Sequence, residues 1–241
     1  MMTNQMTSVT EPLFEYRDGQ PYFRELRVHL RELEIAGSLL RIASLYDAAE
    51  LLDHDEYARP FLERDIAPYG LELWPVAVLL AECILKSEPG EGRPVLDLGC
   101  GLGLTAMAAT LRGWRVLAGD HEPTSLRFAR FNAEANGIRV DSFEHFDWHH
   151  PPTDRKFERV FAADVLYQRV DHVPILKCLE TVLAPDGKTL LADPHRGVAD
   201  RFTDLARDYG WDVALLDGQA PNFFGPKPIS GRMFGLTRAS R

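Results

Sequence analysis

Short apolar and β-branched runs alternate with helical patterns from about Pro94 to the end of the chain. This alternation is typical of a parallel sheet whose strands are joined by crossover helices. We therefore expect an α/β protein with a Rossmann-like open sheet of seven strands and helices on both faces. The expected strands cover residues 95–98, 115–118, 138–143, 159–163, 189–192, 211–216 and 232–237.

Three other segments show a helical or core pattern. Residues 123–136 precede Gly137, a residue type that commonly ends a helix. Residues 173–183 place Ile, Leu and Val on one face, which should cover the sheet. The apolar stretch 71–85 is interrupted by charged residues and a proline, so it predicts a core helix and not a membrane span.

The last two strands are joined by residues 217–231, which are rich in proline and glycine and show no helical pattern. Neighbouring parallel strands need a long crossover, usually a helix, so this final pair is expected to be antiparallel. The loop also leaves the sheet at the edge where ligands bind in open α/β folds. Phe223 and Phe224 on it either contact substrate as part of a lid or anchor the loop to the core.

Residues 1–60 lack the alternation and predict an N-terminal extension to a domain covering residues 61–241. Residues 26–45 resemble either a hairpin that turns at 36–38 or a helix that breaks there, and we favour the hairpin. The opening MMTNQMTS is expected to form a frayed tail. Because this start lacks a basic segment and an apolar signal segment, secretion is not expected.

Composition narrows the possible functions. The 241 residues include 27 Lys and Arg against 36 Asp and Glu, and the net charge of −9 opposes binding to nucleic-acid phosphates. The cysteines Cys83, Cys100 and Cys178 are widely spaced and suggest neither disulfides nor a thiolate zinc site. We expect a cytoplasmic protein with no membrane or nucleic-acid partner.

The stretch PVLDLGCGLGLTAMAA, residues 94–109, carries the clearest chemistry. A strand ends near Asp97, and Gly99, Gly101 and Gly103 form a turn before a helix of small residues, so that backbone can approach a ligand closely. Cys100 lies inside this loop and is expected to be one of the cofactor-binding residues, but no nucleophilic role is assigned to it. The glycine spacing also fits a dinucleotide fingerprint, so it does not choose the cofactor by itself.

Asp97 favours one class of cofactor. A carboxylate two residues before the first glycine would repel the doubly anionic pyrophosphate of a dinucleotide. S-adenosylmethionine carries an ammonium and a sulfonium and no phosphate, so the same carboxylate attracts it. Asp120 ends the next strand, beside His121, and can accept hydrogen bonds from two ribose hydroxyls, which both cofactor classes possess.

The third and fourth strands are followed by acidic and aromatic residues. Asp147 and Trp148 either bind an adenine amine and ring or are a strand-end aspartate and a core tryptophan. Asp164 and Tyr167 lie at the same sheet edge as the glycine loop, where the transferred methyl group should sit. Their alternative roles are to cap a turn and to pack in the core.

These residues resemble the class I, seven-β-strand methyltransferases, and within them the protein lysine methyltransferases. The resemblance covers about residues 65–200 and includes a segment similar to the family's G-x-x-x-W-P, whose tryptophan helps to close the cofactor pocket. The matching positions are Gly70, Trp74, Pro75, Asp97, Gly99, Gly101, Gly103, Asp120, Asp147, Trp148, Asp164 and Tyr167.

Residues 193–196, Asp-Pro-His-Arg, are similar to the D-P-x-R stretch of the electron-transfer-flavoprotein β-subunit lysine methyltransferases, a group also labelled predicted nicotinamide N-methyltransferases. This resemblance implies that Asp164 and Tyr167 lie on the substrate side and hold the incoming amine. His195 and Arg196 either contact an acidic substrate face or close over the site.

Arg196 has a plainer alternative, which is to pair with a neighbouring acid such as Asp193 or Asp200. The histidines at 145, 149 and 150 are possible metal ligands, but no clear set of Asp or Glu residues completes a metal site, so no metal is expected.

The resemblance implies S-adenosylmethionine-dependent N-methyltransfer, with a protein lysine as the first candidate acceptor. Such a transfer is an in-line displacement, in which the enzyme mainly aligns a neutral amine with the S–CH3 bond. The alternatives are a small-molecule N-methyltransferase with the same cofactor and, less favoured by Asp97, an NAD(P)-binding oxidoreductase.

Overall fold

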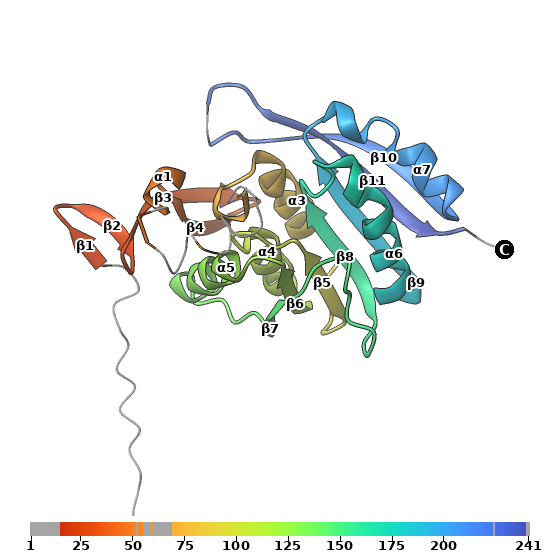
Figure 1. Cartoon of the computed structure of the whole chain (residues 1–241), viewed down its shortest axis with the longest axis horizontal. Helices are drawn as coiled ribbons and strands as arrows, with labels where there is room; N and C mark the ends of the chain where they lie inside the picture. Colours follow the sequence, from red (N-terminus) through yellow and green to blue (C-terminus); the bar gives the residue numbers. More distant parts are fainter. Residues whose placement is uncertain (1–14, 52, 55–58, 60–68, 224, 240–241) are drawn as a thin grey trace, which may run out of the picture.

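The computed structural model describes residues 15–51, 53–54, 59, 69–223 and 225–239, and it contains two sheets (Figure 1). The larger sheet has the strand order β10-β11-β9-β8-β5-β6-β7. Its strands are β5 (Pro94–Leu98), β6 (Arg115–Asp120), β7 (Ser142–His145), β8 (Phe157–Ala163), β9 (Leu183–Asp193), β10 (Trp211–Ala220) and β11 (Ile229–Arg238). The smaller, antiparallel sheet consists of β1 (Glu15–Arg17), β2 (Gln20–Phe23), β3 (Leu26–Ile35) and β4 (Ser38–Leu45).

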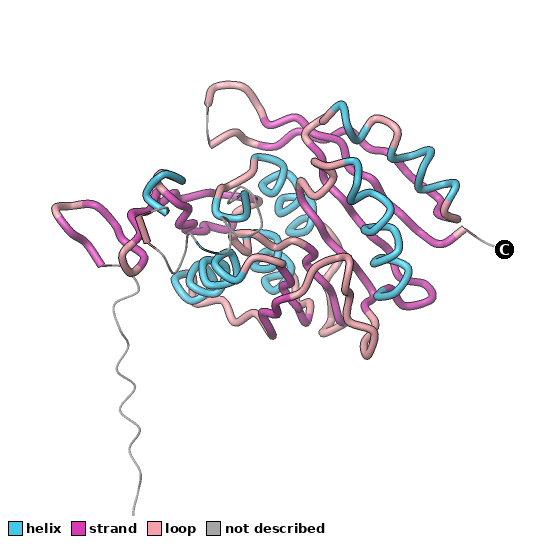
Figure 2. Tube along the Cα trace, viewed as in Figure 1, coloured by secondary structure: helices cyan, strands magenta, loops and turns pink. Residues whose placement is uncertain are grey.

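Helices cover both faces of the larger sheet (Figure 2). On one face α3 (Pro75–Lys86), α4 (Leu104–Leu111) and α5 (Pro123–Ala135) share an apolar cluster with the small sheet. On the other face α6 (His172–Val182) and α7 (Phe202–Asp208) form a second cluster. Shorter helical segments are α1 (Ala48–Leu51), η1 (Tyr69–Leu71), η2 (Arg169–Asp171) and η3 (Gly197–Ala199). None of the helices in the described ranges is long and apolar enough to span a membrane.

The expected Rossmann-like arrangement is confirmed. β9, β8, β5, β6 and β7 are mutually parallel, whereas β11 is antiparallel to both β9 and β10. The third strand differs from its expected bounds of 138–143, because Gly137 has a φ of 64° and the Ile138 amide donates to the Ala133 carbonyl at 2.9 Å. The chain is still completing the end of α5 there, so the strand starts four residues later, at Ser142.

The N-terminal segment forms the hairpin that the sequence favoured. β3 and β4 are joined by Ala36 and Gly37, whose φ angles are 49° and 79°. Two residues with positive φ make a tight turn whose twist matches that of antiparallel strands. The opening MMTNQMTS lies outside the described residues.

Asn132 of α5 ties the small sheet to the glycine loop. Its Oδ1 accepts from the Ala43 amide at 2.8 Å, and its Nδ2 donates to the carbonyls of Ala43 and Leu102, each at 3.0 Å. One turn later, Asn136 bonds both backbone groups of Arg41 in the same way. Asn132 is fully buried, so a single amide supports β4 and the loop after β5 together.

Candidate active site

The glycine loop connects β5 to α4 at the carboxyl edge of the parallel strands. Gly101 and Gly103 have φ angles of 49° and 80°. A Cβ on Gly101 would lie 3.3 Å from the Gly70 carbonyl oxygen, and one on Gly103 would lie 3.0 Å from the Cβ of Ala129. Glycine is therefore required here both by backbone conformation and by close packing.

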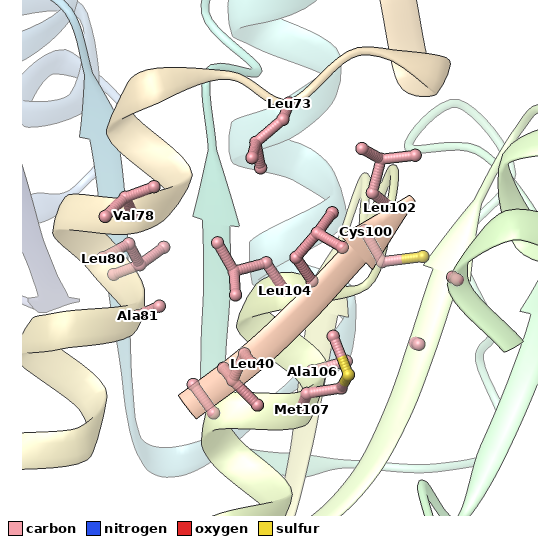
Figure 3. Packing of buried hydrophobic residues seen from close by; sticks show 14 of the residues in the cluster. Leu40, Leu73, Val78, Leu80, Ala81, Cys100, Leu102, Leu104, Ala106 and Met107 are labelled. Carbon is pink, nitrogen blue, oxygen red and sulfur yellow. The ribbon is translucent and has the colours of Figure 1, made fainter. Parts of the chain in front are cut away.

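The rest of the loop is packed in the apolar core. Cys100, Leu102 and Leu104 belong to the same cluster as Leu73 and Leu80 (Figure 3). Burial raises the pKa of the Cys100 thiol well above its usual range, so it stays neutral. This supports the expectation that Cys100 packs rather than attacks a substrate.

Asp120 holds the glycine loop against the end of β6. Its Oδ2 accepts from the Gly101 amide at 2.8 Å and its Oδ1 from the Glu122 amide at 3.0 Å. Burial raises the pKa of Asp120, although the neighbouring His121, whose Nδ1 is 3.5 Å from Oδ1, opposes the shift. These backbone bonds fix the carboxylate where it can accept further hydrogen bonds from a ribose.

Asp97 is compensated less fully, since only the nearby Thr105 hydroxyl and Ala106 amide oppose the effect of burial on its pKa. Its side chain is buried in β5, and neither oxygen has a hydrogen-bond partner among the described residues. Burial raises its pKa to about 7. An unpaired carboxyl group beside a glycine loop fits the ammonium of an amino-acid cofactor, because that ammonium would restore the missing interactions. The residues present thus fit S-adenosylmethionine and would repel a pyrophosphate.

Asp147 and Trp148 differ in what they contact. Asp147 Oδ1 accepts from the amides of His149 and His150 at 2.7 and 3.0 Å, and despite partial burial these bonds lower its pKa. Trp148 is buried, and its Nε1 donates to Asp171 at 3.2 Å. Its ring also lies beside the glycine loop, since a Cβ on Gly99 would be 3.7 Å from it. Trp148 can therefore form an apolar wall next to the cofactor.

The acid after β8 is paired with the arginine after β9. Asp164 has a φ of 59°, and its amide donates to the Ala192 carbonyl at 2.8 Å. The Arg196 Nε and Nη2 donate to Asp164 Oδ1 and Oδ2 at 2.6 and 2.9 Å. This two-point contact raises the pKa of Arg196. The guanidinium is thus paired with Asp164 and not with Asp193 or Asp200.

Arg232, which the sequence argument did not single out, pairs with those two acids instead. Its Nε and Nη1 donate to Asp193 and Asp200, each at 2.9 Å, and its Nη2 donates to the Arg196 carbonyl at 2.7 Å. Asp193 is fully buried, and its Oδ1 also accepts from the Arg196 amide at 2.9 Å. Arg232 and Asp193 therefore fix the backbone of the segment that carries Arg196.

Aromatic side chains surround this ion pair. The Trp74 Nε1 donates to the Tyr69 carbonyl at 2.8 Å, and the Tyr69 ring lies 6.0 Å from Trp74 and 5.8 Å from Tyr167. The Arg196 guanidinium lies 5.4 Å from the Trp74 ring. We call Tyr69, Trp74, Asp164, Tyr167 and Arg196 the acceptor cluster. Tyr69, which the sequence argument missed, contacts both Trp74 and Tyr167, which are 93 positions apart.

Two other expected substrate residues, His195 and Phe223, make contacts outside this cluster. His195 has a φ of 61°, and its Nε2 is 4.0 Å from the exposed Asp217. Phe223 is half-buried and packs against the first apolar cluster, as an anchor for the loop would. Phe224 lies outside the described residues. No group of metal-binding side chains occurs in the ranges that the structure describes.

Comparison with known proteins identifies a family. A model described as a methyltransferase domain matches residues 89–220. A ubiquinone biosynthesis O-methyltransferase of Methylocella silvestris is 30% identical over 127 residues, 52% of this chain and 50% of that protein. A ribosomal protein L11 methyltransferase of Pseudomonas putida is 27% identical over 205 residues, 83% and 65% of the two chains.

A third relative corresponds to the subfamily resemblance. An electron transfer flavoprotein beta subunit lysine methyltransferase of Danio rerio is 41% identical, but over only 73 residues, 30% of this chain and 28% of that protein. The chain thus spans less than two thirds of the length of each relative. The crystal structure of a ribosomal protein L11 methylase from Lactobacillus delbrueckii subsp. bulgaricus has the same fold, with a TM-score of 0.53 at 21% identity over 68% and 79% of the two chains.

Proposed function

Since the chain belongs to the methyltransferase domain family, within the class I enzymes that use S-adenosylmethionine, we propose that it transfers a methyl group to the side-chain amine of a protein lysine. The cofactor supplies an electrophilic methyl group on a sulfonium. The protein must hold that cofactor, bring a neutral amine into line with it and exclude water.

The observation that carries the proposal is the unpaired, buried Asp97 beside the glycine loop. It would bind the cofactor's ammonium, while Asp120 would accept hydrogen bonds from its ribose and Trp148 would pack beside its adenosine. Glycine at 101 and 103 allows the backbone to lie close to the ligand.

The acceptor cluster suits an amine. The rings of Tyr69, Trp74 and Tyr167 provide faces that attract a cationic or methylated nitrogen. Burial, together with nearby carboxylates, raises the pKa of Tyr167 to about 12, so its hydroxyl stays protonated and can donate a hydrogen bond, but it does not act as a base at neutral pH. Asp164 provides the acceptor oxygens that orient an N–H group.

Arg196 has a specific role in this scheme. An unpaired carboxylate beside the amine would favour the ammonium form, which has no lone pair and cannot attack. Arg196 neutralises Asp164 by its two-point contact, so the amine is not held in its charged form. The amine proton would then leave to water, and the neutral nitrogen would have the lone pair needed to form its bond to the methyl carbon as the S–CH3 bond breaks and S-adenosylhomocysteine is left.

The short match to the electron-transfer-flavoprotein lysine methyltransferase supports a lysine acceptor, because that protein is named for one. The net charge of −9 suits a basic, lysine-presenting partner and opposes an RNA substrate. A small-molecule acceptor is the competing outcome, as in the relative named for ubiquinone biosynthesis.

Two experiments test the proposal. Isothermal titration with S-adenosylhomocysteine should show micromolar binding, no binding of NAD, and at least about tenfold weaker binding by Asp97→Asn. Asp186→Asn, at an exposed position, is the matched control. Incubation of cell extract with the protein and a radioactive methyl donor should then label a protein band, and mass spectrometry of that band should show a methylated lysine. Label found only in small molecules would refute the acceptor, and NAD binding alone would refute the cofactor.

A further inference from the structure

A cavity lies at the opposite edge of the sheet from the glycine loop. It has a volume of about 730 Å³ and shares no residue with the loop or the acceptor cluster. Residues near the amino-terminal ends of β5, β6, β8 and β9 line it, together with segments of β10 and β11. Its size falls within the range of sites for small molecules, which is roughly 300–1,000 Å³.

Cations dominate the charged lining, although the chain as a whole is acidic. The cavity is lined by Arg93, Arg159, Lys188 and Arg207, against Glu88 and Asp212. Arg207 is 3.8 Å from Asp204. Within the described part of the chain, the other three cations form no ion pair with a carboxylate, although the charge of Glu158 acts on Arg159, and the side chains of Arg93 and Arg159 donate to backbone carbonyls.

Two of these cations lie near the same aromatic ring. The guanidinium carbons of Arg93 and Arg159 lie 4.9 and 5.8 Å from the ring of the buried Trp114. Burial and the charge of Arg93 lower the pKa of Arg159. Two half-buried like charges repel each other, and an anion bound near both would remove that repulsion.

The floor of the cavity is apolar. Phe161 and the half-exposed Leu190 lie on the sheet face that carries α3, and Phe161 packs edge-on against Trp114 at 6.2 Å. Next to them, Gly235 and Ala214 leave room, since a Cβ on Gly235 would approach no atom closer than 3.7 Å. The site thus joins a flat apolar surface to a pair of guanidinium groups.

We propose that this cavity binds a small organic anion, with a planar apolar body on the sheet face and a carboxylate held by Arg93 and Arg159. Guanidinium groups bind carboxylates with two parallel hydrogen bonds, which gives this ligand class an advantage over a neutral molecule of the same shape. The site is separate from the proposed methyl-transfer chemistry and does not depend on it.

Calorimetric titration with naphthalene-2-carboxylate tests the proposal, with naphthalene-2-carboxamide as its uncharged counterpart and with S-adenosylhomocysteine present to occupy the cofactor site. We expect one carboxylate per chain and at least about tenfold weaker binding of the carboxamide. The Arg93→Gln/Arg159→Gln double variant should bind the carboxylate at least about tenfold more weakly, whereas Arg139→Gln, at an exposed position just before β7, should bind like the wild type.

A substitution in the floor of the cavity, which leaves all four lining cations in place, tests the proposal independently. Gly235→Leu should fill the floor and abolish binding, while Gly235→Ala retains it. Circular dichroism and unchanged affinity for S-adenosylhomocysteine check that each variant is folded. Equal affinity for carboxylate and carboxamide, wild-type binding by the double variant, or no saturable binding of the carboxylate would each overturn the proposal.

Discussion

Replacing Asp97 by asparagine should stabilise the free protein, and the gain should grow with pH. Asp97 is buried and unpaired, and its pKa is about 7, against an ordinary 3.8. An acid with a raised pKa keeps its proton in the folded state after the unfolded chain has lost it. The folded state therefore loses stability as pH rises from about 4 to 7, and the loss is complete above 7.

The size of this effect follows from the two pKa values. They differ by about three units, and each unit corresponds to about 1.4 kcal/mol, so the carboxylate costs up to about 4 kcal/mol above pH 7. By the same relation it costs about 1–2 kcal/mol at pH 5. The advantage of Asp97→Asn over the wild type should therefore increase by about 2–3 kcal/mol between pH 5 and pH 8.

Urea unfolding followed by circular dichroism at these two pH values measures the difference, and other titrating groups cancel in the comparison with wild type. Asp186→Asn, at an exposed position, should change little at either pH. The same Asp97→Asn protein should bind S-adenosylhomocysteine more weakly, so stability and binding move in opposite directions. A stabilisation that is the same at both pH values, or a loss of stability at pH 8, would refute the reasoning.

Three further substitutions test other parts of the site. Arg196→Gln leaves the Asp164 carboxylate without its guanidinium, which should favour the ammonium form of the acceptor. The rise of kcat/KM with pH should therefore move to higher pH by about one unit, whereas Arg196→Lys should restore most of the pH profile. An unshifted profile contradicts the role given to Arg196. Arg232→Met removes the cation that pairs with the fully buried Asp193, so the free energy of unfolding should fall by about 3–5 kcal/mol and the Tm measured by calorimetry by roughly 6–20 °C. The control is Arg238→Met, whose ion pair is with an exposed acid, and an equal fall in Tm in the two variants contradicts the prediction. Asn132→Ala removes the hydrogen bonds to β4 and the glycine loop, so the free energy of unfolding in urea should fall by about 2–4 kcal/mol. The variant should also bind S-adenosylhomocysteine more weakly, and an unchanged affinity contradicts the supporting role of Asn132.

Local patterns were sufficient for most of the sheet. The β-branched runs located the strands of the large sheet except the third, and the pair Ala36-Gly37 located the hairpin turn, because both signals lie within a few residues of the element that they specify. The third strand was misplaced because the cap after Gly137 consumes residues whose side chains also suit a strand. β1 and β2 are short, three and four residues, and gave no pattern long enough to detect.

The ion-pair partners of active-site residues were harder to predict than the places of these residues at the ends of strands. One of the alternatives for Arg196 was to pair with Asp193 or Asp200, which are close to it in sequence, but it pairs with Asp164, 32 residues earlier. The reason is topological: β8 and β9 are parallel neighbours, so the residues that follow them meet at one edge, and the positive φ of Asp164 accompanies its amide bond to Ala192. Sequence separation does not report which strands are adjacent.

Asp97, Asp120, Asp164 and Asp193 are buried aspartates at or just after the carboxyl ends of β5, β6, β8 and β9, and the way each is compensated distinguishes support from binding. Backbone amides bond Asp120, Arg196 pairs with Asp164, and Arg232 pairs with Asp193. Among these four, Asp97 is the one with no hydrogen-bond partner in the described residues. A folded protein retains an uncompensated buried acid at a cost in stability, and a cationic ligand that pairs with it recovers that cost on binding. On this argument we propose that the cofactor's ammonium binds at Asp97, and the growing advantage of Asp97→Asn over the wild type as pH rises measures the stability that the free enzyme gives up by keeping this acid.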